Sequence, residues 1–253
     1  MIATLPLLLT AALGAAPAPA PRTATAWVLG RSPAPGAFAT YDAETRGKTY
    51  TGDLSGAGQE PKEVELVLKT RVTFLFLGTE TVEGARAEWL ELQEELVAAE
   101  VPGMPAGAIP QGPMVTRVLL APDGRMLKVV SQPPGRPAEE STVGASTSVA
   151  VGALHPFGEL AGPLATASET VQVAGLGAVA ATTYESSGPE KVKVWLRARD
   201  GLCLKLVAAS AAARTTYALV RAGSGGKTRI TGEIRKAPDP EEQLRRMMQE
   251  EAR

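Results

Sequence analysis

Residues 62–78, KEVELVLKTRVTFLFLG, constrain the fold more than any other part of this sequence. Alternate positions from Val64 to Phe76 are apolar with a single threonine, the period-2 pattern of a β-strand with one buried face. The opposite positions begin with glutamates and become apolar at the end, at Leu75 and Leu77. The end of this strand therefore needs cover on its second face, from a helix or a crossing segment. The available candidates are the N-terminal tether and a terminal helix.

The length of this strand predicts a curved sheet. Up to ~17 extended residues at ~3.3 Å each span more than about 50 Å, and strands this long must coil or bend within one domain. Period-2 patterns recur near residues 37–42 and in five or six segments after residue 165. Turn residues separate the patterns, and we expect turns at residues 83–84, 122–124, 175–177, 187–189, 200–201 and 223–226.

These patterns predict a mainly β fold. We expect a curved antiparallel sheet, or an incomplete barrel, of about nine to eleven strands with one or two short helices. The stretches 101–113 and 131–140 are rich in proline and glycine and are interpreted as loops. Residues 141–164 fit either a short helix or a loop that covers the sheet.

The N-terminus has the features of an export signal. An apolar run from Ile2 to Leu13 precedes small residues, and we expect cleavage after Gly14 or Ala16. The run is shorter than the ~20 residues that span a bilayer. No cysteine near it would accept a lipid. The protein is therefore expected in the periplasm or at the outer envelope, without a lipid anchor and without a transmembrane span after cleavage.

The chain divides into four expected parts. Residues 1–16 are the signal peptide, and residues 17–35 are a Pro/Ala-rich tether in which residues 27–29 dock on the body. Residues 36–236 form the β domain. Residues 237–253 carry helix signals, with Asp239 as N-cap and an apolar stripe that ends at Met247 and Met248. This C-terminal helix is either a docked or loose tail or a segment that binds an envelope protein.

Composition excludes several kinds of partner. The chain has 26 Lys+Arg against 27 Asp+Glu and only 4% aromatic residues, so a nucleic-acid surface is not expected. One histidine, His155, cannot build a multi-His metal site, and one cysteine forms no internal disulfide. Cys203 is either a packing residue or the site of an intermolecular disulfide. We expect no metal and no organic cofactor.

Two glycine-rich stretches match nucleotide-binding motifs only in part. The stretch from Gly175 to Ala180 fits a dinucleotide fingerprint, but the helix that should follow is missing from the pattern. Residues 222–228, AGSGGKT, resemble the end of a phosphate-binding loop, yet Arg221 stands where the first glycine is required. Both stretches are interpreted as hairpin turns.

No catalytic arrangement stands out. His155 lacks a recognisable nucleophile motif around any serine. The glutamates between residues 88 and 100 could supply carboxylates, but a solvated strand edge explains them as well. We therefore expect a protein that is not an enzyme.

One longer segment carries a resemblance. Residues 169–207, ETVQVAGLGAVAATTYESS followed by VKVWLRARDGLCLKLV, are similar to a segment of exported bacterial β proteins, which in turn resemble the Lol-type periplasmic lipoprotein carriers. The resemblance implies an incomplete antiparallel barrel over roughly residues 36–235, with a concave apolar side that helices close and that can hold acyl chains. It implies no active residue.

The predicted ligand site is this concave apolar face. It would hold a lipid or an acyl chain. A protein with such a site would be a carrier or a binding module. The alternative is a structural or interaction protein of the envelope whose face is a filled core. The residues expected on the face are Leu66, Leu68, Val72, Phe74, Phe76, Val192, Val194, Leu196, Leu204 and Leu206.

Overall fold

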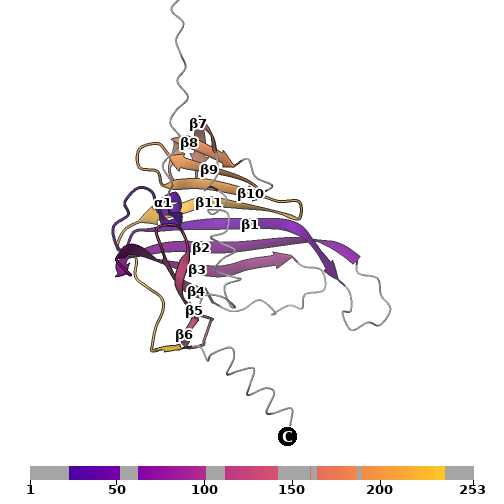
Figure 1. The fold of residues 1–253 in the computed structure, drawn as a ribbon. Coiled ribbons are helices and arrows are strands. Elements are labelled where there is room, and N and C mark those ends of the chain that lie inside the picture. Colours follow the sequence, from indigo (N-terminus) through magenta and orange to yellow (C-terminus); the bar gives the residue numbers. More distant parts are fainter. Residues whose placement is uncertain are drawn as a thin grey trace, which may run out of the picture.

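The structure, a computed structural model, describes residues 23–51, 62–100, 112–141, 160, 164–186 and 190–236. These residues form one curved sheet of 12 strands and one helix, α1 (Ala24–Leu29) (Figure 1). The mainly β, curved and open sheet is confirmed, with one strand more than the expected upper number. The strands are β1 (Phe38–Thr51), β2 (Lys62–Val82), β3 (Ala85–Glu100), β4 (Met114–Leu120), β5 (Met126–Gln132), β6 (Ala138–Ser141), β7 (Leu164–Val173), β8 (Gly177–Ser186), β9 (Lys191–Arg197), β10 (Cys203–Ala209), β11 (Ala213–Gly223) and β12 (Ile234–Lys236).

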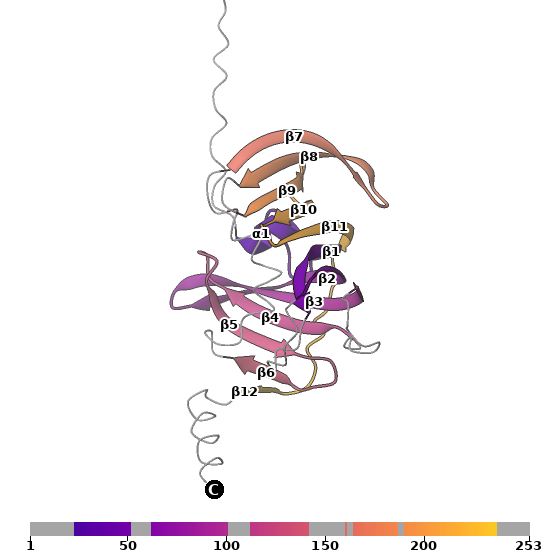
Figure 2. The same ribbon diagram turned by 90° about the vertical axis from the view of Figure 1, so that its right-hand side faces the viewer.

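The strands follow the order β12-β6-β5-β4-β3-β2-β1-β11-β10-β9-β8-β7. Most neighbours are antiparallel hairpins, and the turn between β2 and β3 falls at the predicted positions. Glu83 and Gly84 both have positive φ there, 52° and 79°, as a two-residue hairpin turn requires. The strands β7 to β11 arch over α1, which lies inside the curve (Figure 2). We call the side of the sheet that faces α1 the core face and the opposite side the outer face.

Two pairings join distant parts of the chain. The first strand, β1, pairs with β11, so that Phe38 lies opposite Gly223. The last strand, β12, pairs with β6 in parallel, with Ile234 opposite Ala138. The hairpin turn predicted at residues 223–226 is therefore wrong, because the chain leaves the sheet after β11. Residues 224–233, named the crossing segment here, run over the outer face to the far edge (Figure 1).

The short strand β6 corrects a second expectation. The stretch 131–140 was interpreted as a loop, but β5 extends to Gln132 and β6 begins at Ala138. Ala138 is fully buried between β5 and β12. Strand β3 runs to Glu100, directly before the stretch 101–113 that is interpreted as a loop.

Helix α1 fills the core face. Trp27 and Val28 are buried, and the Trp27 ring makes an edge contact with Tyr184 at 5.4 Å between centroids. The Tyr41 hydroxyl lies 3.1 Å from both the Val28 and the Cys203 carbonyl oxygens and donates to them. The docking expected for residues 27–29 is thus observed. It occurs through a helix, which the prediction of a tether over residues 17–35 did not include.

Both ends of α1 are fixed by specific residues. The Thr23 hydroxyl accepts a hydrogen bond from the Ala26 amide at 3.2 Å, as an N-cap does. Gly30 ends the helix with φ of 90°. A Cβ at this glycine would lie 2.7 Å from the Asp200 carbonyl oxygen. Only glycine therefore fits the close approach between α1 and the β9–β10 turn.

The crossing segment provides the cover that Leu75 needs on the outer face. Leu75 is buried, and a Cβ added to Gly226 would lie 2.7 Å from its Cδ1 atom. Of the two kinds of cover expected, a helix or a crossing segment, the structure shows a crossing segment. It comes from residues 224–233 and not from the tether. The signal peptide, the start of the tether, His155 and the expected C-terminal helix lie outside the described residues.

Candidate functional site

The structure places most of the predicted ligand face inside the core. Leu66 and Leu68 are half-buried near one end of β2. The other eight residues are no more than 3% exposed, and seven of them belong to one cluster with Trp27 and Val28. These eight are Val72, Phe74, Phe76, Val192, Val194, Leu196, Leu204 and Leu206.

The cavities bounded by described residues lie elsewhere. Four of these cavities have volumes of about 560, 380, 340 and 180 Å³. Leu66 lines the cavity of about 340 Å³, beside the β10–β11 turn, and the other nine predicted residues line none of the four. Around α1 the core face is packed by the protein's own side chains. Space for a ligand is found at the end of the sheet and on the outer face.

The largest of these cavities, of about 560 Å³, lies where α1, the β7–β8 turn, the β9–β10 turn and the end of β11 meet. We call it the end cleft. Its volume is within the range of small-molecule sites, roughly 300–1,000 Å³. The lining residues are Leu29, Arg31, Ala37, Phe38, Ala174, Gly175, Leu176, Arg197, Arg199, Asp200, Leu202, Leu219, Val220, Arg221, Ala222 and Gly223.

Positive charge exceeds negative charge in the end cleft, since four arginines and one aspartate line it. Arg197 donates to both carboxylate oxygens of Asp200, at 2.8 and 2.6 Å, and Arg199 lies 3.6 Å from the same carboxylate. The hydrogen bond from Arg197 is the main cause that lowers the pKa of Asp200. Arg221 stacks on the Phe38 ring at 5.3 Å. Positive charge is thus available for an anionic group.

The same cleft carries exposed apolar side chains. Leu176, in the β7–β8 turn, is 52% exposed, and Val220, in β11, is 40% exposed. Val220 lies at an irregularity of the β1–β11 register, where Thr40 pairs with Arg221 and Tyr41 pairs with Leu219. The bulge brings Val220 out of the ladder. An exposed apolar side chain is common on protein surfaces, but two in one cationic cleft form an amphipathic site.

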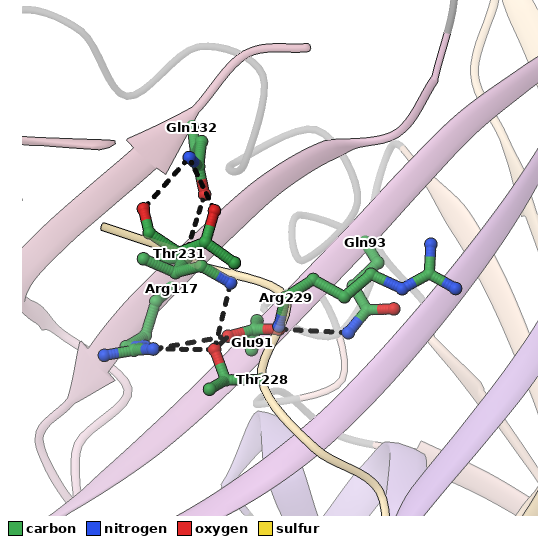
Figure 3. A network of polar contacts seen from close by, with 8 residues as sticks. Glu91, Gln93, Arg117, Gln132, Thr228, Arg229 and Thr231 are labelled. Atoms are coloured by element: carbon green, nitrogen blue, oxygen red, sulfur yellow. Dashed lines mark hydrogen bonds and ion pairs between the residues drawn. The ribbon is translucent and has the colours of Figure 1, made fainter. Parts of the chain in front are cut away.

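A buried carboxylate anchors the crossing segment on the outer face (Figure 3). Glu91 is fully buried and accepts hydrogen bonds from the Arg229 amide at 2.9 Å, from the Gln93 side chain at 3.0 Å and from the Thr228 hydroxyl. Arg117 lies 3.5 Å away and forms the ion pair. The interpretation of this glutamate stretch as a solvated edge is therefore wrong at Glu91, because β3 is an internal strand.

The P-loop-like residues 222–228 have a different role from the one their motif suggests. The Thr228 hydroxyl and the Arg229 amide donate hydrogen bonds to the carboxylate of Glu91, a group of the protein itself and not of a nucleotide. Further along, Gln132 holds the segment through the Thr231 amide at 3.0 Å and the Thr231 carbonyl at 3.2 Å (Figure 3). This fixes the path from β11 to β12.

The remaining titratable groups near the core offer little chemistry. Burial raises the pKa of the Cys203 thiol to about 12, which leaves it protonated and poorly nucleophilic. Its full burial agrees with a packing role. Burial also raises the pKa of Glu94 and, to about 12, that of Tyr217. Within the described part of the chain, no group of three or more His, Cys, Asp and Glu side chains could hold a metal ion.

Comparison with known protein families finds no match, and no curated protein is significantly similar to this chain. Among the described residues, no helix is both long and apolar enough to cross a membrane. The candidate site therefore depends on the geometry of this chain alone.

Sequence reasoning missed the end cleft entirely. Its arginines come from the loop after α1, the end of β9, the β9–β10 turn and β11, and these elements are distant in sequence. Only the short pattern Arg197-x-Arg199-Asp200, in a predicted turn, gave a local signal, and it does not by itself indicate a ligand.

Proposed function

We propose that the protein binds an anionic amphiphile, a molecule with an apolar chain and an acidic head such as a fatty acid, in the end cleft. One observation carries this proposal. The exposed apolar side chains of Leu176 and Val220 and four arginines line the same cavity of about 560 Å³. Burial of such apolar surface contributes about 25 cal/mol per Å², and arginine supplies charge-assisted hydrogen bonds to an acidic head.

The proposal keeps the expected class of ligand but moves its place. The core face that was expected to hold the acyl chain is packed around Trp27. The end cleft lies at the edge of this packed region, with Leu29, Leu202 and Leu219 among its apolar lining. An acyl chain would contact these side chains, and its acidic head would be held by Arg31 or Arg221.

The rest of the function is part of the same proposal. The protein is exported to the periplasm or outer envelope and acts as a carrier or binding module without catalysis. Full burial withholds the Cys203 thiol from nucleophilic attack on a substrate. The second candidate is an envelope interaction protein without a ligand, and the packed core around α1 favours it.

The first experiment is native mass spectrometry of the mature chain, recovered from the cell envelope without detergent. An added mass of several hundred daltons that organic solvent extracts supports the carrier function and gives the class of ligand. An unliganded mass, with no later uptake of a fluorescent fatty acid, excludes the proposal and favours the interaction protein.

Variants then place the ligand. Leu176→Asp puts a carboxylate beside the expected acyl chain and should weaken fatty-acid binding about tenfold or more. Val97→Asp is the matched control, because Val97 is 57% exposed and lines none of the four cavities. Equal binding by both variants would exclude the end cleft as the site.

A core variant separates the predicted face from the end cleft. Phe74 is 1% exposed and makes an edge contact with Tyr41 at 5.8 Å. Phe74→Ser should therefore abolish the cooperative melting transition, because it leaves a cavity and a buried hydroxyl in a packed core. A stably folded Phe74→Ser variant that loses fatty-acid binding would return the ligand to the originally predicted core face.

A further inference from the structure

A second cleft lies on the outer face, beside the crossing segment. Two adjoining cavities, of about 380 and 180 Å³, share Thr73, Gln93, Arg221 and Arg229 as lining residues. We call the combined space the outer cleft. Its walls come from four strands, β1, β2, β3 and β11, and from the crossing segment. The outer cleft is therefore formed by the tertiary structure and not by one loop.

The floor of the outer cleft is polar and largely buried. The Thr40 and Thr73 hydroxyls lie 2.9 Å apart, on neighbouring strands, and Thr40 is buried. Gln93, also buried, uses its amide nitrogen for the 3.0 Å bond to Glu91. These hydrogen bonds satisfy the buried polar groups within the protein, so the fold maintains a polar floor that can face a polar ligand.

Positive charge surrounds this floor. Arg71, Arg221 and Arg229 line the larger cavity, Lys227 lines the smaller one, and Glu95 is the carboxylate among the lining residues. Arg71 forms an ion pair with Asp42 at 2.9 Å, and Glu95 also interacts with it electrostatically. The Arg229 side chain extends away from Glu91 (Figure 3), and no ion pair joins it to a carboxylate in the part of the chain that the structure describes.

The neighbouring Glu91 site shows which chemistry this face accepts. There a hydroxyl, a backbone amide, a side-chain amide and an arginine converge on one carboxylate. In the outer cleft, two residues further along β3, hydroxyls, an amide side chain and cations occur again, now around a cavity. Arginine forks and hydroxyl groups match the oxygen atoms of a phosphate group.

We propose that the outer cleft binds the phosphate group of a small phosphate ester or of a phospholipid headgroup. This inference does not depend on the proposed function of the end cleft. Arg221 lines both clefts, whereas Arg229 and Arg71 line only the outer one and Arg31 only the end cleft. Variants can therefore test the two sites separately.

Isothermal titration with inorganic phosphate at low salt, against chloride at equal ionic strength, tests the proposal. We expect saturable binding of one phosphate per chain. Arg229→Gln should weaken it about tenfold, as the loss of one charge-assisted hydrogen bond predicts. Arg229→Gln keeps the backbone amide that binds Glu91, so an unchanged melting temperature shows that the fold is intact.

Arg86→Gln is the matched control, because Arg86 is exposed at the start of β3 and lines none of the four cavities. The control should bind phosphate like the unaltered protein. Absence of saturable binding, or equal binding by Arg229→Gln and the unaltered protein, would overturn the proposal.

Two arms distinguish the sources of the phosphate group. If glycerol 3-phosphate competes with inorganic phosphate, a soluble phosphate ester is sufficient for binding to the outer cleft. If the protein sediments with phosphatidylcholine vesicles that contain phosphatidic acid, and glycerol 3-phosphate does not compete, the ligand is the lipid headgroup. In either arm Arg229→Gln must remove the effect while Arg31→Gln leaves it, and the reverse result assigns phosphate to the end cleft and overturns the proposal.

Discussion

The two faces of the central strands β1 to β3 are covered in different ways. On the core face, α1 inserts Trp27 and Val28 into an apolar cluster. On the outer face, the crossing segment is held mainly through the buried Glu91 side chain and the half-buried Gln132 side chain. One cover gains its stability from burial of apolar surface and the other from hydrogen bonds. An irregular segment can therefore cover the second face of the central strands where another sheet would use a helix.

The apolar cover should matter most. Trp27→Ala removes a buried ring from the centre of the core and should reduce the free energy of unfolding by about 3–5 kcal/mol. Urea denaturation followed by circular dichroism measures the change. Trp195→Ala is the control, since Trp195 is half-buried outside the core face, and it should cost clearly less. Equal losses would mean that α1 is only loosely docked.

The polar contacts of the crossing segment should make the second largest contribution to the free energy of unfolding. Glu91→Ala leaves Arg117 and Gln93 without their carboxylate and should cost about 3 kcal/mol. Glu95→Ala, at an exposed position of the same strand, should change the stability by less than about 0.5 kcal/mol. Hydrogen exchange at the Arg229 amide should rise strongly in Glu91→Ala. Protection at this amide as in the unaltered protein would show that the carboxylate does not anchor the segment.

Gly30 tests how closely the end of α1 is packed against the β9–β10 turn. Gly30→Ala introduces a Cβ at positive φ, 2.7 Å from the Asp200 carbonyl oxygen, and should cost roughly 1–3 kcal/mol. Gly124→Ala, at positive φ in the β4–β5 turn but with open space around it, should cost only the backbone strain. The difference between their melting temperatures measures how much more restrictive the Gly30 position is, and identical values would exclude a steric cost from the Asp200 carbonyl.

The smallest expected effect concerns Glu94 on the core face. Burial raises its pKa in the folded protein above the ordinary value of 4.5. The folded state then binds more protons than the unfolded state, so stability falls as the pH rises from 4.5 through the raised value. Glu94→Gln should therefore raise the melting temperature at pH 7 by roughly 1–3 °C and have less effect below pH 4. A benefit that persists unchanged at low pH would contradict this account.

Local signals predicted the local parts of the fold. The turns at Glu83–Gly84 and at residues 122–124 were found because glycine and aspartate enforce them within two or three residues. The long strand β2 was recognised from its own period. The core residues of β2, β9 and β10 were also identified correctly as one apolar face, although their role as a ligand site stays a prediction.

The remaining parts depend on contacts between distant residues. Residues 223–226 were interpreted as a hairpin turn, because a glycine-rich stretch allows a turn and a crossing segment equally. Helix α1 has six residues in an Ala/Pro-rich region, too few for a periodic signal. The clefts were missed for the same reason, since Arg31, Arg199 and Arg221 meet only after the sheet curves.

The pairing of β1 with β11 has a consequence for folding kinetics. The centre of the sheet joins residue 38 to residue 223, so the central ladder cannot close until almost the whole described chain is available. Loop closure over such a distance is slow, and topologies rich in distant pairings fold in milliseconds to seconds or longer. Strands β1, β2 and β3 follow one another along the chain and can pair early, but the other edge of β1 then stays without its β11 neighbour. Until β11 arrives, that edge presents unpaired backbone groups that can pair with another chain.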